Sequence, residues 1–128
     1  LVNTPVNDDD KYSLTDVEAA CTSIGEQLAD KDDYHLVVIT STVFPGSTAN
    51  EIRGWLETAS GKTAGVDFGL CYSPEFIAIG NIIEGLERPD FYLVGEETVR
   101  AGDVLCDIYE EIGLNDAPVV RWTPPPQK

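Results

Sequence analysis

Three polar motifs of this chain carry side chains that could take part in chemistry: residues 4–5, 41–46 and 73–76. The first is Thr4-Pro5. A threonine-proline pair at the end of a strand fixes the direction of the backbone and leaves a hydroxyl at the edge of a sheet. The same pair also commonly terminates a strand, so by itself it leaves a purely structural role open.

The second motif is Ser41-Thr42, which is followed by Pro45-Gly46 and a predicted helix. Hydroxyls beside the unpaired amides at the start of a helix suit a phosphate or a ribose. The alternative is that Ser41 or Thr42 only caps that helix. The motif alone does not decide between a ligand site and a cap.

The third motif places Glu75 after a proline and before an apolar segment. A carboxylate at the edge of such a segment can have a raised pKa, which suits a general acid or base. Alternatively, Glu75 is an ordinary first-turn residue whose charge the helix dipole stabilises. The catalytic interpretation therefore needs support from the other two motifs.

Apolar runs predict the strands that would position these motifs. Leu1 and Val2 would be the last residues of a strand that leads into the first motif. Continuous apolar runs are typical of strands that are covered on both faces. Such runs occupy residues 36–39, 68–72, 91–95 and 118–120.

Apolar residues at spacings of three and four predict three helices. The first would follow Ser13, which with Asp16 comes close to a capping box. The second would stop near Gly61. The inward faces are predicted to be Leu14, Val17, Cys21, Ile24 and Leu28; Ile52, Trp55, Leu56 and Ala59; and Val99, Val104, Leu105, Ile108 and Ile112.

This alternation of strands and helices predicts an α/β fold with a mostly parallel sheet and helices on both faces. In an open sheet of this kind, ligands bind beside the carboxyl ends of the strands. Each of the three motifs follows such a strand end. They could therefore line one crevice.

The chain has 128 residues and a net charge of −15, from 23 acidic and 8 basic residues. A surface this acidic repels nucleic acids and anionic membranes, so neither is an expected partner. It also suits a protein adapted to high salt, where counterions screen the repulsion between like charges. The sequence shows no apolar run long enough for a membrane helix and no signal-peptide pattern, so we expect a cytoplasmic protein.

Cys21, Cys71 and Cys106 have no paired spacing. We interpret them as small hydrophobic residues in a reducing compartment, rather than as disulfide partners or metal ligands. His35 is the single histidine and precedes an apolar run, where we expect a loop position. One histidine cannot build a histidine-based zinc site, so we expect no metal centre.

Together, the motifs are more specific than any one of them. They follow one another as Val-Asn-Thr-Pro at 2–5, Ser-Thr-Val at 41–43 with Pro45-Gly46, Ser-Pro-Glu-Phe at 73–76, and Pro-Asp at 89–90 before a strand ending in Gly95. In this order and approximate spacing, the chain resembles the UDP-glucose/GDP-mannose dehydrogenase family from Leu1 to about Val120. It corresponds to a minor part of such an enzyme.

The resemblance implies the C-terminal half of a Rossmann-like NAD-binding domain over residues 1–122, with 123–128 as a Pro-rich linker or chain end. Enzymes of this family use NAD to oxidise the C6 alcohol of a nucleotide sugar to a carboxylate. The substrate would be UDP-glucose, UDP-N-acetylmannosamine or GDP-mannose, and the full-length enzyme a homo-oligomer. Because the chain starts at Leu1 and contains no Met, we expect it to begin inside a longer polypeptide.

The resemblance also implies roles for single residues. Glu75 would be the catalytic acid/base, notably in hydrolysis of a thioester intermediate, and Thr42 would touch the catalytic water. The cofactor-binding residues would be Val2, Asn3, Thr4, Pro5, Ser41, Thr42 and Val43. The substrate-binding residues would be Glu75, Phe76, Ile77, Ala78 and Ile79.

The chain departs from the family pattern in two respects. Many UDP-glucose enzymes carry a second glutamate four residues after the first, where this chain has Ile79. That difference favours the branch acting on other sugars, such as UDP-N-acetylmannosamine.

The chain also lacks the G-x-G-x-x-G turn and the Gly-Gly-x-Cys-x-Pro-Lys segment that holds the thiol nucleophile. We therefore expect the chain alone to be inactive, because the dinucleotide loses its main anchor and the second oxidation its covalent route.

Two other interpretations compete with this one. A β-hydroxyacid-type dehydrogenase would share the domain, but Ser-Pro-Glu-Phe followed by Pro-Asp is not the pattern of that group. A stand-alone acidic α/β domain, used for binding or assembly without catalysis, would account for the missing catalytic segments.

Overall fold

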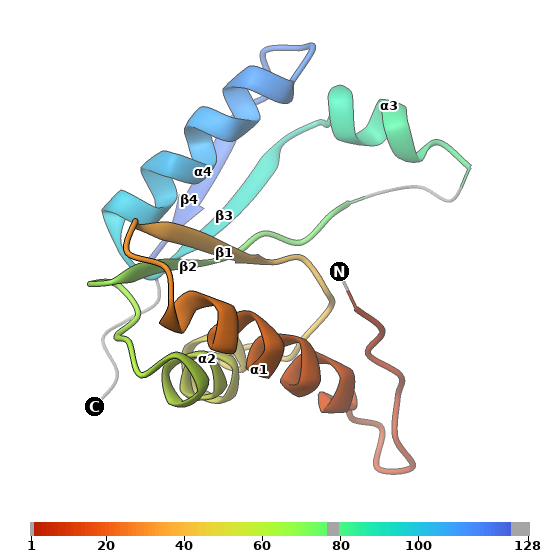
Figure 1. The fold of residues 1–128 in the computed structure, drawn as a ribbon. Coiled ribbons are helices and arrows are strands. Elements are labelled where there is room, and N and C mark those ends of the chain that lie inside the picture. The colour runs from red at the N-terminus through yellow and green to blue at the C-terminus, as the bar shows by residue number, and fades with distance from the viewer. Residues whose placement is uncertain (1, 77–79, 124–128) are drawn as a thin grey trace.

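The computed structural model describes residues 2–76 and 80–123 (Figure 1). Helices and strands alternate along the chain, as the apolar pattern predicts. The helices are α1 (Thr15–Ala29), α2 (Arg53–Ser60), α3 (Ile82–Glu87) and α4 (Val99–Ile112), and a π-helical turn, η1 (Thr48–Ile52), leads directly into α2. The strands are β1 (His35–Ile39), β2 (Phe68–Tyr72), β3 (Tyr92–Glu96) and β4 (Val119–Trp122).

The strands form one sheet in the order β1-β2-β3-β4. β1 pairs with β2, and β3 with β4, in parallel; β2 and β3 are antiparallel and join only through Cys71–Glu96 and Tyr72–Gly95. The expectation of an α/β fold with a mostly parallel sheet and helices on both faces is confirmed. Because of the antiparallel join, β3 and β4 run in the opposite direction to β1 and β2.

Two hydrophobic cores lie on the two faces of the sheet, because successive residues of a strand point to opposite sides. On one face, Ile39 of β1 belongs to the same core as Val17 of α1 and Leu56 of α2. On the other face, Val94 of β3 packs with Leu105 of α4. Figure 1 shows α1 and α2 side by side on one side of the sheet and α4 on the other.

An ion-pair network holds the edge strand β4 against α4. The buried carboxylate of Glu96, at the end of β3, accepts hydrogen bonds from Nε and Nη2 of Arg121 at 2.8 and 2.6 Å. Nη1 of Arg121 donates to Asp103 of α4 at 2.7 Å. A buried carboxylate is stable only when it is paired and hydrogen-bonded, and the arginine fork provides both. Gly102 leaves room for Glu96, since a Cβ there would collide with its side chain.

Expectations for the first helix and its surroundings are partly wrong. Val2 is not part of a strand. α1 has Leu14 at its N-cap without a side-chain hydrogen bond, so Ser13 forms no capping box. The hydroxyl of Ser13 lies 3.1 Å from that of Thr15 instead, a local contact that competes with capping. His35 is the exposed first residue of β1 rather than a loop residue.

The inward faces of α1 and α4 also differ from those expected. Ile24 is exposed and Gly25 is buried, because α2 approaches α1 too closely for a side chain at that position. In α4, Ala101 and Leu105 are buried, whereas Val99, Ile108 and Ile112 are exposed. The sequence pattern does not indicate α3, because its isoleucines, Ile82 and Ile83, are exposed and form no core stripe.

We predict that Gly25→Ala destabilises the fold and that Gly54→Ala, a matched control in α2, does not. A Cβ at Gly25 would stand 2.6 Å from Cβ of Ala59, so the two helices must move apart. We expect the free energy of unfolding to fall by about 1–3 kcal/mol. At Gly54 the same atom meets nothing within 4 Å. Alanine at position 54 should raise the free energy of unfolding by about 0.5–1 kcal/mol, because alanine has a higher helix propensity than glycine.

Urea unfolding followed by circular dichroism measures both changes. Equal effects of the two substitutions would show that close contact at Gly25 does not limit the packing of α1 on α2.

Candidate functional site

The first two motifs meet at the carboxyl end of β1. Ser41 is 5% exposed. Its Oγ accepts a hydrogen bond from the amide of Val2 and donates one to the carbonyl of Val2, each at 2.8 Å. One buried hydroxyl thus fastens the N-terminal segment to the loop that follows β1. The backbone around Val2 is therefore adjacent to that of Ser41, as expected for two walls of one crevice.

The third motif is fastened to the same end of the sheet. The amide of Ser73 donates to the carbonyl of Ile39, the last residue of β1, at 2.9 Å. Its Oγ donates to the carbonyl of Leu93 in β3 at 2.7 Å and lies 2.6 Å from the hydroxyl of Tyr109 in α4. Since the single proton of Ser73 goes to Leu93, the hydroxyl of Tyr109 is the donor in the second bond.

The ends of β1 and β2 and the N-terminal segment lie on one side of the molecule (Figure 1). The side chains at this rim differ in accessibility: Thr4 is half-buried, whereas Thr42 and Glu75 are exposed. Within the described residues, none of these three makes a side-chain hydrogen bond to another. The structure therefore brings the backbones of the motifs together, and the roles of the three side chains stay predictions.

The other residues expected at the site divide into buried and exposed groups. Val2 is half-buried against the core that contains Val43, while Asn3 and Pro5 are exposed. Phe76 packs on Phe91 just before β3, with ring centroids 5.0 Å apart. Ile77, Ala78 and Ile79 lie outside the described residues.

Tyr109 is a residue of this region that sequence reasoning missed. Burial raises its pKa, the hydrogen bond with Ser73 lowers it, and the negative charge of Glu75 raises it. The available signal was spacing: Tyr109 follows the buried Leu105 by four residues, which places both on one face of α4.

The cysteines have the environment of packing residues. Cys21 and Cys71 are buried and Cys106 is half-buried, and all three are free. Burial raises the pKa of Cys21 to about 11 and that of Cys71 to about 12. Their thiols are therefore protonated at neutral pH and are poor nucleophiles.

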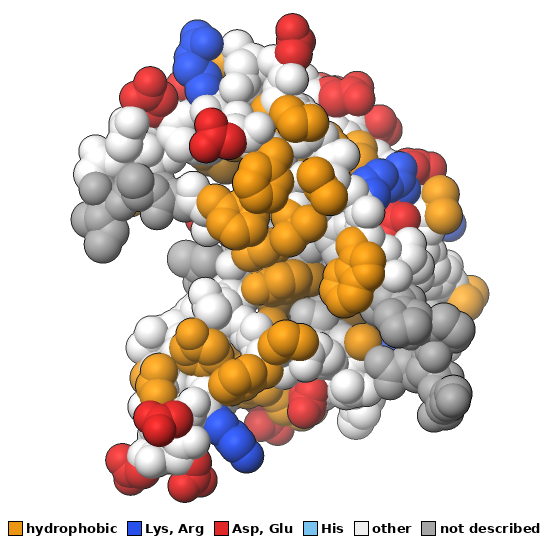
Figure 2. All heavy atoms as spheres, turned by 180° about the vertical axis from the view of Figure 1, so that it is seen from behind, with side chains coloured by type: hydrophobic (Ala, Val, Ile, Leu, Met, Phe, Trp, Pro, Cys, Tyr) orange, Lys and Arg blue, Asp and Glu red, His pale blue; other side chains and the backbone are white. Residues whose placement is uncertain are grey.

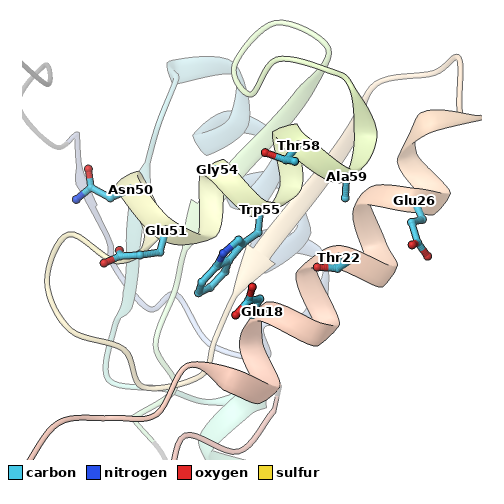
Figure 3. Close-up of a pocket in the computed structure, with 9 residues that line it drawn as sticks. All are labelled: Glu18, Thr22, Glu26, Asn50, Glu51, Gly54, Trp55, Thr58 and Ala59. Atoms are coloured by element: carbon cyan, nitrogen blue, oxygen red, sulfur yellow. The ribbon is translucent and has the colours of Figure 1, made fainter.

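A pocket of about 530 Å³ lies between α1 and α2 (Figure 3). Trp55 of α2 and Glu18 of α1 project into it, and Glu26 and Glu51 are among its other lining residues. None of the residues expected at the site lines this pocket. It is therefore a separate acidic groove.

Among the residues with described structure, no helix has the length and apolarity needed to cross a bilayer.

Comparison with known proteins agrees with the motifs. The family model described as UDP-glucose/GDP-mannose dehydrogenase family, NAD binding domain, matches residues 1–113. The chain belongs to this family. The expectation of NAD as the family's cofactor is confirmed, since the matched region is its NAD binding domain.

Individual relatives cover nearly all of this chain. A GDP-mannose 6-dehydrogenase of Pseudomonas syringae pv. tomato is 41% identical over 120 residues, which are 94% of this chain and 27% of the relative. A UDP-glucose 6-dehydrogenase of Haloferax volcanii is 38% identical over 92% of this chain and 28% of its own length. The crystal structure of a ternary complex of GDP-mannose dehydrogenase from Pseudomonas aeruginosa superposes with a TM-score of 0.89 and 37% identity, over 96% of this chain and 28% of that one. The chain thus spans little more than a quarter of these relatives.

We predict that Ser41→Ala loosens the N-terminal segment, whereas Thr42→Ala, at the adjacent exposed position, does not. Removing the Ser41 hydroxyl leaves the amide and carbonyl of Val2 without this partner, which should cost about 1–3 kcal/mol of stability. Amide hydrogen exchange should accelerate over residues 2–6 in the first variant only. Unchanged exchange there would mean that other contacts hold the segment at the rim.

Proposed function

We propose that this chain is part of an NAD-dependent nucleotide-sugar 6-dehydrogenase, which oxidises the C6 alcohol of the sugar to a carboxylate. One observation carries the proposal: the hydrogen bonds of Ser41 to Val2 and of Ser73 to Ile39 hold the backbones of the three motif segments at the carboxyl end of β1. That is where an open α/β sheet binds its ligands. The reaction itself is inferred from the family to which the chain belongs.

The roles follow from position at this rim. Residues 2–5 and 41–43 would contact NAD, through exposed groups of Asn3, Pro5 and Thr42 and through the backbone of the buried positions. Glu75 would be the general acid/base, since its carboxylate is exposed to a bound ligand. Thr42 would position the water that attacks the thioester. Phe76 and residues 77–79 would contact the sugar nucleotide.

The sugar is the least determined part of the proposal. Relatives named for GDP-mannose and for UDP-glucose have similar identity to this chain, 41% and 38%. Ile79, at the position of a second glutamate in many UDP-glucose enzymes, favours another sugar such as that of UDP-N-acetylmannosamine. We therefore propose the nucleotide-sugar class and leave the choice among these three to the assay.

Several further properties remain predictions. They are a cytoplasmic location, a homo-oligomeric full-length enzyme, adaptation to high salt, and a domain boundary between residues 122 and 123. The alternative function, an acidic binding or assembly domain without catalysis, is favoured by one observation. The sequence lacks both the glycine-rich turn and the segment with the thiol nucleophile.

We predict that the complete polypeptide containing this chain forms NADH from NAD with GDP-mannose, UDP-glucose or UDP-N-acetylmannosamine. Glu75→Gln should lower the rate by about 10²–10⁴-fold, the usual contribution of a general acid or base. Glu111→Gln, at an exposed position of α4, is the matched control and should leave the rate unchanged. No NADH with any of the three nucleotide sugars would rule out the dehydrogenase function.

We also predict that residues 1–128 alone bind NAD only weakly. The sequence contains no glycine-rich turn to hold the pyrophosphate, so most of the binding free energy is missing. Isothermal titration calorimetry should detect no binding in the micromolar range. Micromolar affinity would show that the rim formed by the three motifs is a sufficient cofactor site.

A further inference from the structure

The helices cover the two faces of the sheet unequally. Tyr92 and Arg121, in neighbouring strands, both contact α4: Tyr92 stacks on Tyr109, and Arg121 binds Asp103. Because side chains alternate along a strand, Val120 points to the other face. On that face α1 and α2 pack over β1 and β2, and none of the described helices lies on the half formed by β3 and β4 (Figure 1).

This uncovered half carries large apolar side chains. Val120 is 49% exposed and Trp122 is 60% exposed, and Phe44 of the loop after β1 is also exposed. Phe44, Tyr72 and Trp122 line a cavity of about 610 Å³. We call the surface formed by Phe44, Tyr72, Val120 and Trp122 the open face. Figure 2 shows hydrophobic side chains gathered in a broad band on the side opposite to the view of Figure 1.

The same cavity has one polar wall with an unmet hydrogen bond. Oε1 of Glu97 pairs with Nη1 of Arg53 at 2.7 Å, and both residues line the cavity. Oε2 of Glu97 is buried and has no hydrogen-bond partner within residues 2–76 and 80–123. Arg53 also binds Glu57 at 3.0 Å, so one cation serves two carboxylates. Arg53, Glu57 and Glu97 together carry a net negative charge beside the cavity, which therefore suits an occupant with a cationic group.

We propose that the open face is the docking site for a segment of the same polypeptide that lies outside this chain, one that presents apolar side chains and a cationic group for Glu97. The length of the relatives supports this source, since this chain matches only 27% of the Pseudomonas syringae enzyme. β4, the last strand of this chain, ends at Trp122 on the open face.

Charge separates this occupant from a second copy of the chain. Two copies would each carry a net charge of −15, and their repulsion opposes close contact unless salt screens it. A segment with a basic residue is instead attracted to this chain and provides the donor for Glu97. Val43, Pro45 and Gly46 of the second motif also line this cavity. The inference does not depend on the catalytic roles proposed above, because it uses the packing of the sheet, the charge of the cavity and the length of the relatives.

The test compares residues 1–128 with the complete product of the gene that encodes them, by oxidative footprinting read by mass spectrometry. In the complete product, labelling of Trp122 should fall roughly six-fold, from 60% exposure to the near-complete burial of an interface core. Trp55, in the groove between α1 and α2, is the internal control and should be labelled equally in both. A second readout is Trp122→Ser, which should lower the unfolding temperature of the complete product more than that of residues 1–128.

Val66→Ser, at an exposed apolar position that does not line the cavity, is the control for the second readout. Equal labelling of Trp122 in both proteins would overturn the proposal. Protection in residues 1–128 that grows with concentration, together with a dimer mass in ultracentrifugation, would replace it with a second copy. A gene product that ends with this chain would also overturn it.

Discussion

The geometry of the rim depends on the hydroxyl of Ser73, the first residue after β2. Ser73 is only 2% exposed, so its hydroxyl must be hydrogen-bonded. The partners of the hydroxyl come from β3 and α4, and the amide of the same residue bonds to β1. Four elements are thereby held at one point. Glu75 follows two residues later, so an exposed carboxylate starts from a fixed strand end.

The antiparallel join between β2 and β3 divides the sheet into two halves with different surroundings. β1 and β2 end together, and their ends carry the motifs of the proposed NAD and sugar site. β3 and β4 run the other way and are held to α4 by the Glu96–Arg121–Asp103 network. Because α1 and α2 pack over β1 and β2, the described helices leave the open face uncovered, beside the rim that carries the exposed Thr42 and Glu75.

Local pattern predicted the central elements well and their details poorly. The runs at 36–39 and 68–72 form β1 and β2, since continuous runs of largely apolar residues suit strands covered on both faces. The inward face of α1 differs at Gly25, and α4 buries Ala101 where Val99 and Ile108 were favoured. Hydrophobicity alone misled in both helices, because the close approach of α1 to α2, and of α4 to β2, selects small residues rather than large ones.

The sequence by itself determined the family, the fold class and the order of the motifs, because these depend on residue types and on spacing along the chain. Only the tertiary structure decided that Ser41 binds Val2, that Ser73 meets Tyr109 at a distance of 36 residues, and that β3 turns back against β2. Each of these is a contact between segments far apart in the chain. Their formation depends on which buried polar groups find partners once the sheet is assembled, and no local pattern encodes that choice.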